Sequence, residues 1–205
     1  MEEKNMSTVE YRGIRGFVGA EVMQDDAEGY VTGEVFRIAG IAELSKTRSS
    51  DSETKYYDNV AAIVTSSEGS DEVTCSVSAI ELPVLARITG QKYDEELGIL
   101  IEGKRANKYF AIGYITEDTD GNEVYVWRYK GTFNIPDVTH VTKNDGTDSN
   151  GQELTFTGIS TTYAFAKYGE PAMALNVEVA KGLADVSTFF DQVTTPDTLK
   201  AVAGA

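Results

Sequence analysis

The chain has 205 residues, and 33 acidic against 18 basic side chains give it a formal net charge of −15. This excess of acid argues against a nucleic-acid-binding surface, because affinity for phosphates comes from clustered Lys and Arg. With one Cys and one His, the composition also excludes a disulfide framework and a zinc site built on these ligands.

The two ends of the chain carry no core pattern. An N-terminal arm is expected at 1–10, where "MEEKNMSTVE" lacks the apolar region of a signal peptide, so we expect a soluble intracellular product. A C-terminal tail is expected at 192–205. No apolar run is long enough to span a bilayer, and the length fits a single domain over 1–205.

Alternation of apolar and polar residues predicts strands along most of the chain. In chain order they are expected at 11–23, 30–44, 59–67, 72–80, 107–115, 123–133, 152–166 and 176–179. In 72–80 one face is apolar, with Val73, Cys75, Val77 and Ala79. We expect Cys75 to be a small buried thiol. The Asp-Gly pair at 120–121 predicts a tight hairpin, because Gly adopts positive φ freely.

Two helical segments are expected. Residues 81–90 have Pro83 in the first turn and Gly90 as a C-cap, and residues 185–193 fit one or two turns. The elements together predict a mainly β fold, an antiparallel β-sandwich or partly open barrel with one flanking α-helix and a long inter-strand loop.

Catalytic and metal-binding patterns are weak. The single histidine, His140, lies in a polar loop, and among 33 acids some carboxylate pair is always available. Two acidic turns, 117–123 and 143–153, resemble calcium loops but lack the ligand spacing of an EF-hand. Turn geometry alone explains their glycines. We therefore expect no enzyme activity, no cofactor and no metal.

Residues 45–59, "SKTRSSDSETKYYDN", form a long, charged connection that precedes an apolar strand. Long structureless connections in compact domains are usually functional or disordered, so 45–57 is predicted to be a loop of one of these two kinds. Tyr56 and Tyr57 are adjacent, so their rings point to opposite faces of an extended chain, and one of them is available for an interface. The candidate contact residues are Lys46, Arg48, Asp51, Glu53, Lys55, Tyr56, Tyr57 and Asp58.

Four motifs occur in an order that spans nearly the whole chain. They are "KYYDN" (55–59), "LPVLARITG" (82–90) followed by "YDEELGILIEG", "KNDGTDSNGQELTFTGI" (143–159) after "GTFNIPD" (131–137), and "STFFDQVTTPDTL" (187–199). This ordered set resembles the major tail proteins, the tail-tube subunits of long-tailed bacteriophages and prophages of Gram-positive bacteria.

The resemblance implies a structural protein that assembles in the host bacterial cytoplasm and resides in the virion tail. It implies stacked six-membered rings around a tape-measure protein, with tail terminator and baseplate proteins as further partners. It also implies that the 45–57 connection reaches the neighbouring ring, where its mixed charges fix register and partner.

The resemblance further implies a lumen through which double-stranded DNA passes without specific binding. Such a lumen should be polar, lightly acidic and free of basic side chains. Two strand faces have this character: Glu72, Thr74, Ser76 and Ser78, and Glu153, Thr155 and Thr157. The same faces fit the solvent-exposed side of an ordinary sheet.

Other functions stay open. The first alternative is a monomeric β-sandwich module whose Tyr-rich loops recognise carbohydrate or a receptor. The second is a secreted hexameric tube protein of a contractile injection system, which shares ring formation. A hydrolase comes last, because the chain has one histidine.

Overall fold

The computed structural model describes residues 8–142 and 150–202. Its strands are β1 (Tyr11–Asp25), β2 (Tyr30–Thr32), β3 (Phe36–Arg37), β4 (Ile41–Tyr57), β5 (Val60–Val77), β6 (Lys92–Asp94), β7 (Ile99–Ile101), β8 (Phe110–Asp118), β9 (Glu123–Phe133), β10 (Asp137–Val138), β11 (Gln152–Ile159) and β12 (Ala174–Glu178). The helices are α1 (Leu82–Thr89) and a 3-10 turn, η1 (Val179–Lys181). None of the helices in the described ranges is long and apolar enough to cross a membrane.

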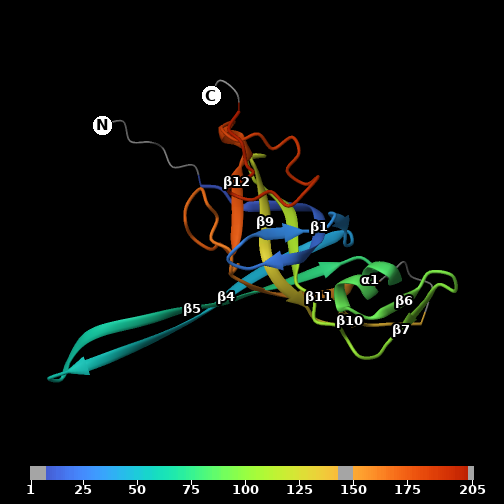
Figure 1. The fold of residues 1–205 in the computed structure, drawn as a ribbon, viewed down its shortest axis with the longest axis horizontal. Coiled ribbons are helices and arrows are strands. Elements are labelled where there is room, and N and C mark those ends of the chain that lie inside the picture. Colours follow the sequence, from blue (N-terminus) through green and yellow to red (C-terminus); the bar gives the residue numbers. More distant parts are fainter. Residues whose placement is uncertain (1–7, 143–149, 203–205) are drawn as a thin grey trace.

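Ten strands form one curled antiparallel sheet in the order β2-β1-β8-β9-β11-β5-β4, with β3, β10 and β12 paired beside this path. The sheet does not close into a barrel, and β6 and β7 make a separate two-stranded sheet (Figure 1). The predicted mainly β, antiparallel fold with one α-helix is confirmed.

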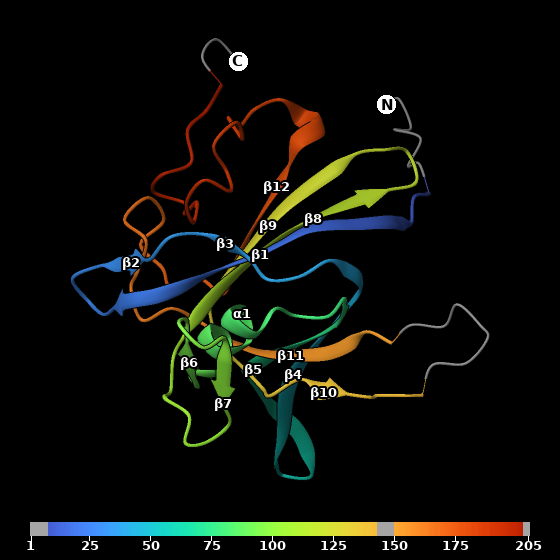
Figure 2. The ribbon, with the colours of Figure 1, turned by 90° about the vertical axis from the view of Figure 1, so that its right-hand side faces the viewer.

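The core lies in two parts, on the two faces of β1, β8 and β9 (Figure 2). The first part packs against β5, β11 and α1 and includes Phe17, Val73, Cys75, Phe110, Ile112, Leu154 and Phe156. The second is covered by the residues that follow β11, here called the C-terminal segment (160–202), and includes Trp127, Tyr129, Phe165, Phe189 and Val193. The expected burial of Cys75 is confirmed, and this burial raises the pKa of its thiol to about 12.

Residues 185–193 form isolated turns rather than the expected helix. The carbonyl of Phe189 accepts hydrogen bonds from Trp127 Nε1 at 2.9 Å and from Thr194 Oγ1 at 2.9 Å. These two bonds take the place of a helical i→i+4 bond and fix the segment on β9. Part of the expected tail at 192–205 is packed against the body of the molecule, because residues 193–195 are buried and Ala201 bridges Ala184.

Helix α1 confirms the prediction for 81–90. Pro83 occupies its first turn, and Gly90 follows it with a left-handed φ of 69°. A Cβ on Gly90 would lie 2.2 Å from the carbonyl oxygen of Ala106, so both the conformation and the packing require glycine here.

The predicted loop at 45–57 is instead part of a strand. β4 and β5 pair from Ile41 opposite Val77 to Tyr57 opposite Val60, and a two-residue turn closes the hairpin. Asp58 and Asn59 have φ values of 51° and 65°, the conformation that two-residue hairpin turns need. Along one edge of each strand the backbone groups bond to the other strand, and this pairing orders the segment without a buried face. The expected strands at 59–67 and 72–80 are correspondingly one continuous strand.

Other strand boundaries differ from those that the sequence predicts. The expected strand at 30–44 divides among β2, β3 and β4, and the one at 152–166 ends at Ile159. Ala79, which the alternation placed on the buried face, follows the end of β5 and is exposed. The hairpin predicted at the Asp-Gly pair is confirmed between β8 and β9. Residues 1–7 of the expected N-terminal arm lie outside the described residues.

Candidate assembly surfaces

The outer part of the β4–β5 hairpin, here called the projecting hairpin (residues 49–68), extends away from the body of the molecule (Figure 1). At ~3.3 Å per residue its nine residues in β4 reach roughly 30 Å. Its end, here called the hairpin tip (residues 53–64), carries five large apolar side chains that are about half to two-thirds exposed: Tyr56, Tyr57, Val60, Ile63 and Val64. An apolar cluster this far from the core marks an interaction surface.

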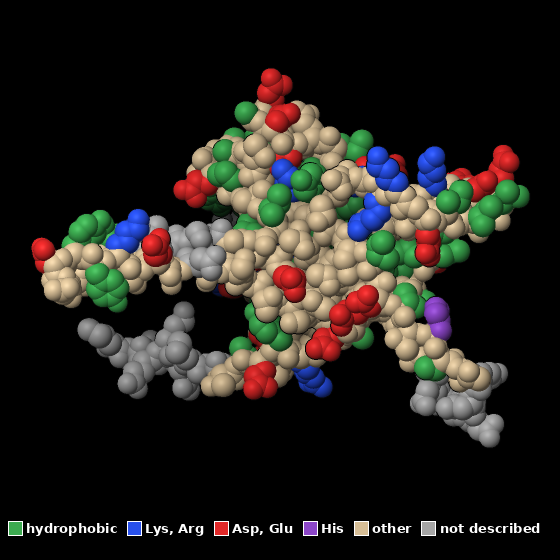
Figure 3. Space-filling view, turned by 90° about the horizontal axis from the view of Figure 1, so that it is seen from below, with side chains coloured by type: hydrophobic (Ala, Val, Ile, Leu, Met, Phe, Trp, Pro, Cys, Tyr) green, Lys and Arg blue, Asp and Glu red, His purple; other side chains and the backbone are tan. Residues whose placement is uncertain are grey.

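The two tyrosines of the tip are both exposed and belong to different faces. Tyr57 lies opposite Val60, and Tyr56 lies opposite Ala61. Figure 3 shows hydrophobic side chains on both faces of the projecting hairpin, next to charged ones. The prediction that the two rings point to opposite faces is confirmed by this register.

The predicted contact residues divide into two groups along the hairpin. Glu53, Lys55 and Asp58 are exposed at the tip, together with the tyrosines. Lys46 and Arg48 lie where the hairpin joins the sheet, and Arg48 Nη2 contacts Met173 Sδ at 3.1 Å within the same chain. The side chain of Asp51 lies outside what the structure describes.

A buried ion pair fixes the root of the projecting hairpin. Arg128 Nη1 of β9 donates to Asp71 Oδ2 of β5, and both residues are buried. Arg128 Nε also donates to Tyr114 Oη at 3.2 Å, and Arg48 Nε lies 3.8 Å from Asp71 Oδ1. Burial raises the pKa of Tyr114, so its hydroxyl stays neutral beside the guanidinium.

Sequence reasoning missed this pair, although one signal was available. Arg128 stands between Trp127 and Tyr129, in a strand rich in aromatic and β-branched residues. A charge at such a position is buried when the strand is central, and a buried charge needs a partner. The sequence does not identify that partner as Asp71, which is 57 residues away.

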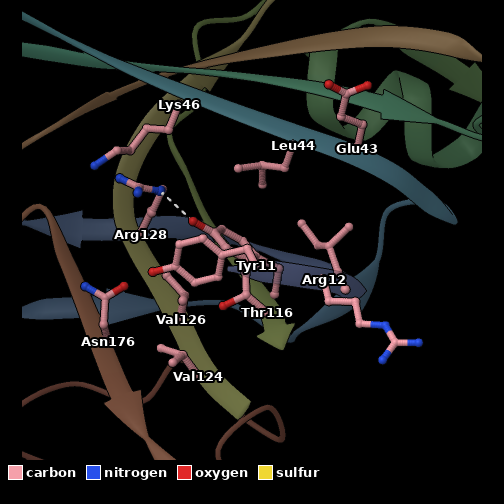
Figure 4. Close-up of a pocket in the computed structure, with 13 residues that line it drawn as sticks. Tyr11, Arg12, Glu43, Leu44, Lys46, Thr116, Val124, Val126, Arg128 and Asn176 are labelled. Atoms are coloured by element: carbon pink, nitrogen blue, oxygen red, sulfur yellow. Dashed lines mark hydrogen bonds between the residues drawn. The ribbon is translucent and has the colours of Figure 1, made fainter. Parts of the chain in front are cut away.

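A cavity of about 570 Å³ opens between the start of β1 and the inner part of β4 (Figure 4). Residues 11–15 of β1 pair on one side with β8, and β4 pairs on one side with β5, so two strand edges face this cavity. Figure 4 shows the side chains of Arg12, Lys46 and the buried Arg128 among those that line it, and its thirteen lining residues include no His, Cys or Ser.

The two predicted polar strand faces come together in the structure. Glu153 lies opposite Ser76, Thr155 opposite Thr74 and Thr157 opposite Glu72. Ser78 follows the end of β5, and its Oγ accepts from the backbone N–H of Gly40 at 3.0 Å.

The register extends this surface onto two further strands. On β4, Glu43, Ser45 and Thr47 pair with the same β5 residues, and on β10 Asp137 pairs with Glu153. We call the whole set the acidic face; its ten members are Glu43, Ser45, Thr47, Glu72, Thr74, Ser76, Asp137, Glu153, Thr155 and Thr157. It holds four acids and no Lys or Arg. The alternation at 43–47, which sequence reasoning passed over, was the available signal for the β4 members.

The acidic turn at 117–123 is a hairpin turn. Asp118 accepts from the Asn122 side-chain amide at 2.9 Å, from Asn122 N at 2.8 Å and from Asp120 N at 2.9 Å, and these bonds hold its pKa below the ordinary value. Within the described ranges, no group of three or more His, Cys, Asp or Glu residues is placed to hold a metal ion. Most of the other acidic turn, 143–153, lies outside the described residues.

A family model described as phage tail tube protein matches residues 22–195. The matched range contains the projecting hairpin, the acidic face, α1 and the C-terminal segment up to the buried threonines. No curated protein matches the chain.

Proposed function

Because the chain belongs to the phage tail tube protein family, and is thus a structural protein of the virion tail, we propose that its copies self-assemble into stacked six-membered rings through which DNA passes. The observation that carries the proposal is the acidic face. It forms one side of four adjacent strands, in the order β4-β5-β11-β10, and the other side of β4, β5 and β11 packs against the first core.

The dimensions of such a tube fit a DNA duplex. Six copies with four strands each make a closed sheet of about 24 strands, with a backbone diameter of roughly 50 Å at ~4.8 Å per strand and about 40° tilt. Side chains of roughly 6 Å on each side leave about 38 Å, which admits a duplex about 20 Å wide. β4 and β10 each have one pairing neighbour among the described strands, so each offers an edge to the next copy.

The charge of the acidic face suits passage rather than binding. Glu43, Glu72, Asp137 and Glu153 would repeat around the ring and repel phosphate, and Lys46 and Arg48 lie on the opposite side of β4. A surface without cations releases no counterions when DNA enters, so DNA gains no affinity for it.

The projecting hairpin supplies the contact between rings in this proposal. Its apolar tip is exposed in a single copy, and its reach of roughly 30 Å matches the scale of a neighbouring subunit. A tape-measure protein inside the tube, with terminator and baseplate proteins at its ends, completes the proposed set of partners. Assembly in the cytoplasm of a Gram-positive host, as part of a long-tailed phage, belongs to the same proposal.

Negative-stain electron microscopy of the purified protein, at several protein and salt concentrations, tests the proposal. Rings or hollow tubes with a lumen wider than a duplex are the expected result. Particles that remain single subunits at the highest concentration, even with a tape-measure fragment added, would favour a monomeric binding module instead.

A further inference from the structure

The small sheet of β6 and β7 presents an apolar surface to solvent. Lys92 lies opposite Ile101, and Asp94 lies opposite Ile99, so these side chains share one face, while Tyr93 and Leu100 share the other. Ile99, Ile101 and Leu97 are about 46%, 55% and 72% exposed. We call Lys92, Leu97, Ile99 and Ile101 the distal surface.

An ordered turn holds this surface in place. Asp94 Oδ1 accepts from the backbone N–H groups of Glu96 at 2.9 Å and Leu97 at 3.1 Å, and Gly98 N donates to Asp94 O at 2.8 Å. The exposure of Leu97 is therefore a fixed feature of the fold. Tyr93 and Leu100 on the other face are half-buried, so that face packs against the body of the molecule while the distal surface stays exposed.

The distal surface and the hairpin tip lie at opposite ends of the long axis of the molecule (Figure 1). Two different surfaces at opposite ends, when complementary, join copies head to tail, and such contacts generate open filaments. A tip-to-tip contact would be isologous instead and would stop after two partners.

We propose that the hairpin tip of one copy docks on the distal surface of a copy in the next ring. The inference rests on the proposed tube and names the acceptor of the hairpin within it. Both surfaces combine large aliphatic side chains with a few charges. Lys92 and Asp94 share the isoleucine face of the acceptor, and Glu53, Lys55 and Asp58 are exposed at the donor tip, so each surface carries charges of both signs beside its apolar residues.

The backbone of both elements fits the same contact. Beyond Arg48, β4 and β5 pair with each other alone, and β6 and β7 form a two-stranded sheet. Each element therefore has strand edges with unpaired backbone groups among the described residues, and isolated two-stranded sheets gain stability from a further layer or strand.

A pair of complementary defects tests the contact. In the donor variant Tyr57→Ser/Val60→Ser the tip is polar, and in the acceptor variant Leu97→Ser/Ile99→Ser the distal surface is polar. All four side chains are exposed, so both variants keep the fold, which circular dichroism checks. Each variant alone is expected to form rings. The mass of protein in tubes should fall at least about tenfold, because every junction between rings loses the favourable burial of the substituted apolar side chains. A one-to-one mixture is expected to form two-ring stacks, since one intact tip and one intact distal surface remain.

The control is Leu97→Met/Ile99→Val, which keeps the acceptor apolar and is expected to form tubes like the unaltered chain. If the acceptor variant stacks as well as the unaltered chain, the contact is wrong while the tube itself stands. If both variants fail to stack and their mixture gives no two-ring stacks, the two surfaces do not meet. An unaltered chain that forms neither rings nor tubes would overturn the proposed tube, and the contact with it.

Disulfide trapping gives a second readout that does not depend on polar substitutions. Cys75 is buried and its raised pKa keeps it unreactive, so introduced cysteines react alone. Oxidation of mixed Val60→Cys and Leu97→Cys copies should give covalent dimers that neither variant gives by itself. Dimers from Val60→Cys copies alone would show a tip-to-tip contact. If assembled tubes that combine Leu97→Cys copies with either Val60→Cys or Val64→Cys copies give no dimers, the acceptor lies elsewhere.

Discussion

Arg128 of β9 donates to the carboxylate of Asp71 of β5 in the protein interior, at the level where the projecting hairpin leaves the sheet. The pair joins the strand that carries the hairpin to a central strand that packs on both parts of the core. Its charges therefore couple the direction of the hairpin to the body of the subunit.

Replacing Arg128 with Met is expected to lower the free energy of unfolding by about 3–5 kcal/mol, because Asp71 would stay buried without its partner. Urea denaturation followed by tryptophan fluorescence measures this loss. The matched control is Lys181→Met, which breaks an exposed pair with Glu178 and should cost about 0.5 kcal/mol or less. A similar small loss at both positions would mean that the buried pair contributes nothing to the fold.

Asp25 ties the end of β1 to the C-terminal segment. Burial disfavours its charge, but hydrogen bonds from Lys130 Nζ at 2.5 Å and from the backbone N–H groups of Thr162 and Tyr163 outweigh this effect and lower its pKa. Because the folded-state pKa lies below the unfolded value, the stabilisation is present above about pH 4 and is lost as the pH falls through the folded value.

The Asp25→Asn variant is accordingly expected to lose about 2 kcal/mol of unfolding free energy at pH 7. The difference from the unaltered chain should shrink steadily below about pH 4, as the unaltered carboxylate becomes protonated. Urea denaturation at pH 7, 5 and 3 measures both values. A difference that is constant over this range would show that the charge of Asp25 is irrelevant to its role.

Gly90 should tolerate no side chain. Its φ is left-handed, and a Cβ at this position would lie 2.2 Å from the carbonyl oxygen of Ala106, so Gly90→Ala is expected to cost about 2 kcal/mol or more. Gly182 has a similar φ of 62° but open space around it, so Gly182→Ala should cost about 1 kcal/mol. Thermal unfolding measures the stability that each variant loses. The Gly182→Ala loss reports the conformational cost alone, so an equal loss in Gly90→Ala would contradict the close packing at Ala106.

The sequence predicts well those elements whose bounds are set by residues close by in the chain. The bounds of β9 agree with the predicted 123–133, because its alternating side chains face two apolar layers and an Asp-Gly turn precedes it. Helix α1 is predictable from Pro83 and Gly90, which act within single turns. The sequence does not predict that the polar faces of β5 and β11 lie side by side, because alternation does not determine the register between two strands.

The projecting hairpin escaped prediction because hydrophobic alternation reports burial, and neither face of its tip is buried. Its signal was the Asp58-Asn59 pair, two residue types that accept positive φ, followed directly by the apolar run 60–64. The turns near Phe189 escaped for a different reason. The carbonyl of Phe189 accepts a hydrogen bond from Trp127, which is 62 residues away in the chain, and a local sequence pattern does not reveal such a partner.

The acidic face gives the most direct test of the proposed lumen. A Glu72→Lys/Asp137→Lys/Glu153→Lys variant adds three cations to each copy on side chains that are exposed in the single subunit, so folding and ring formation should persist. If these residues line the tube, the lumen becomes basic, and short duplex DNA should be retained in a strongly salt-dependent way, because its counterions are released on binding. Co-sedimentation of labelled DNA with assembled tubes, at low and at physiological salt, measures the retention. The control carries the same three added lysines at Glu28, Glu178 and Asp191, which lie outside the acidic face. Equal retention by the two variants would mean that the acidic face is not the surface along which DNA passes.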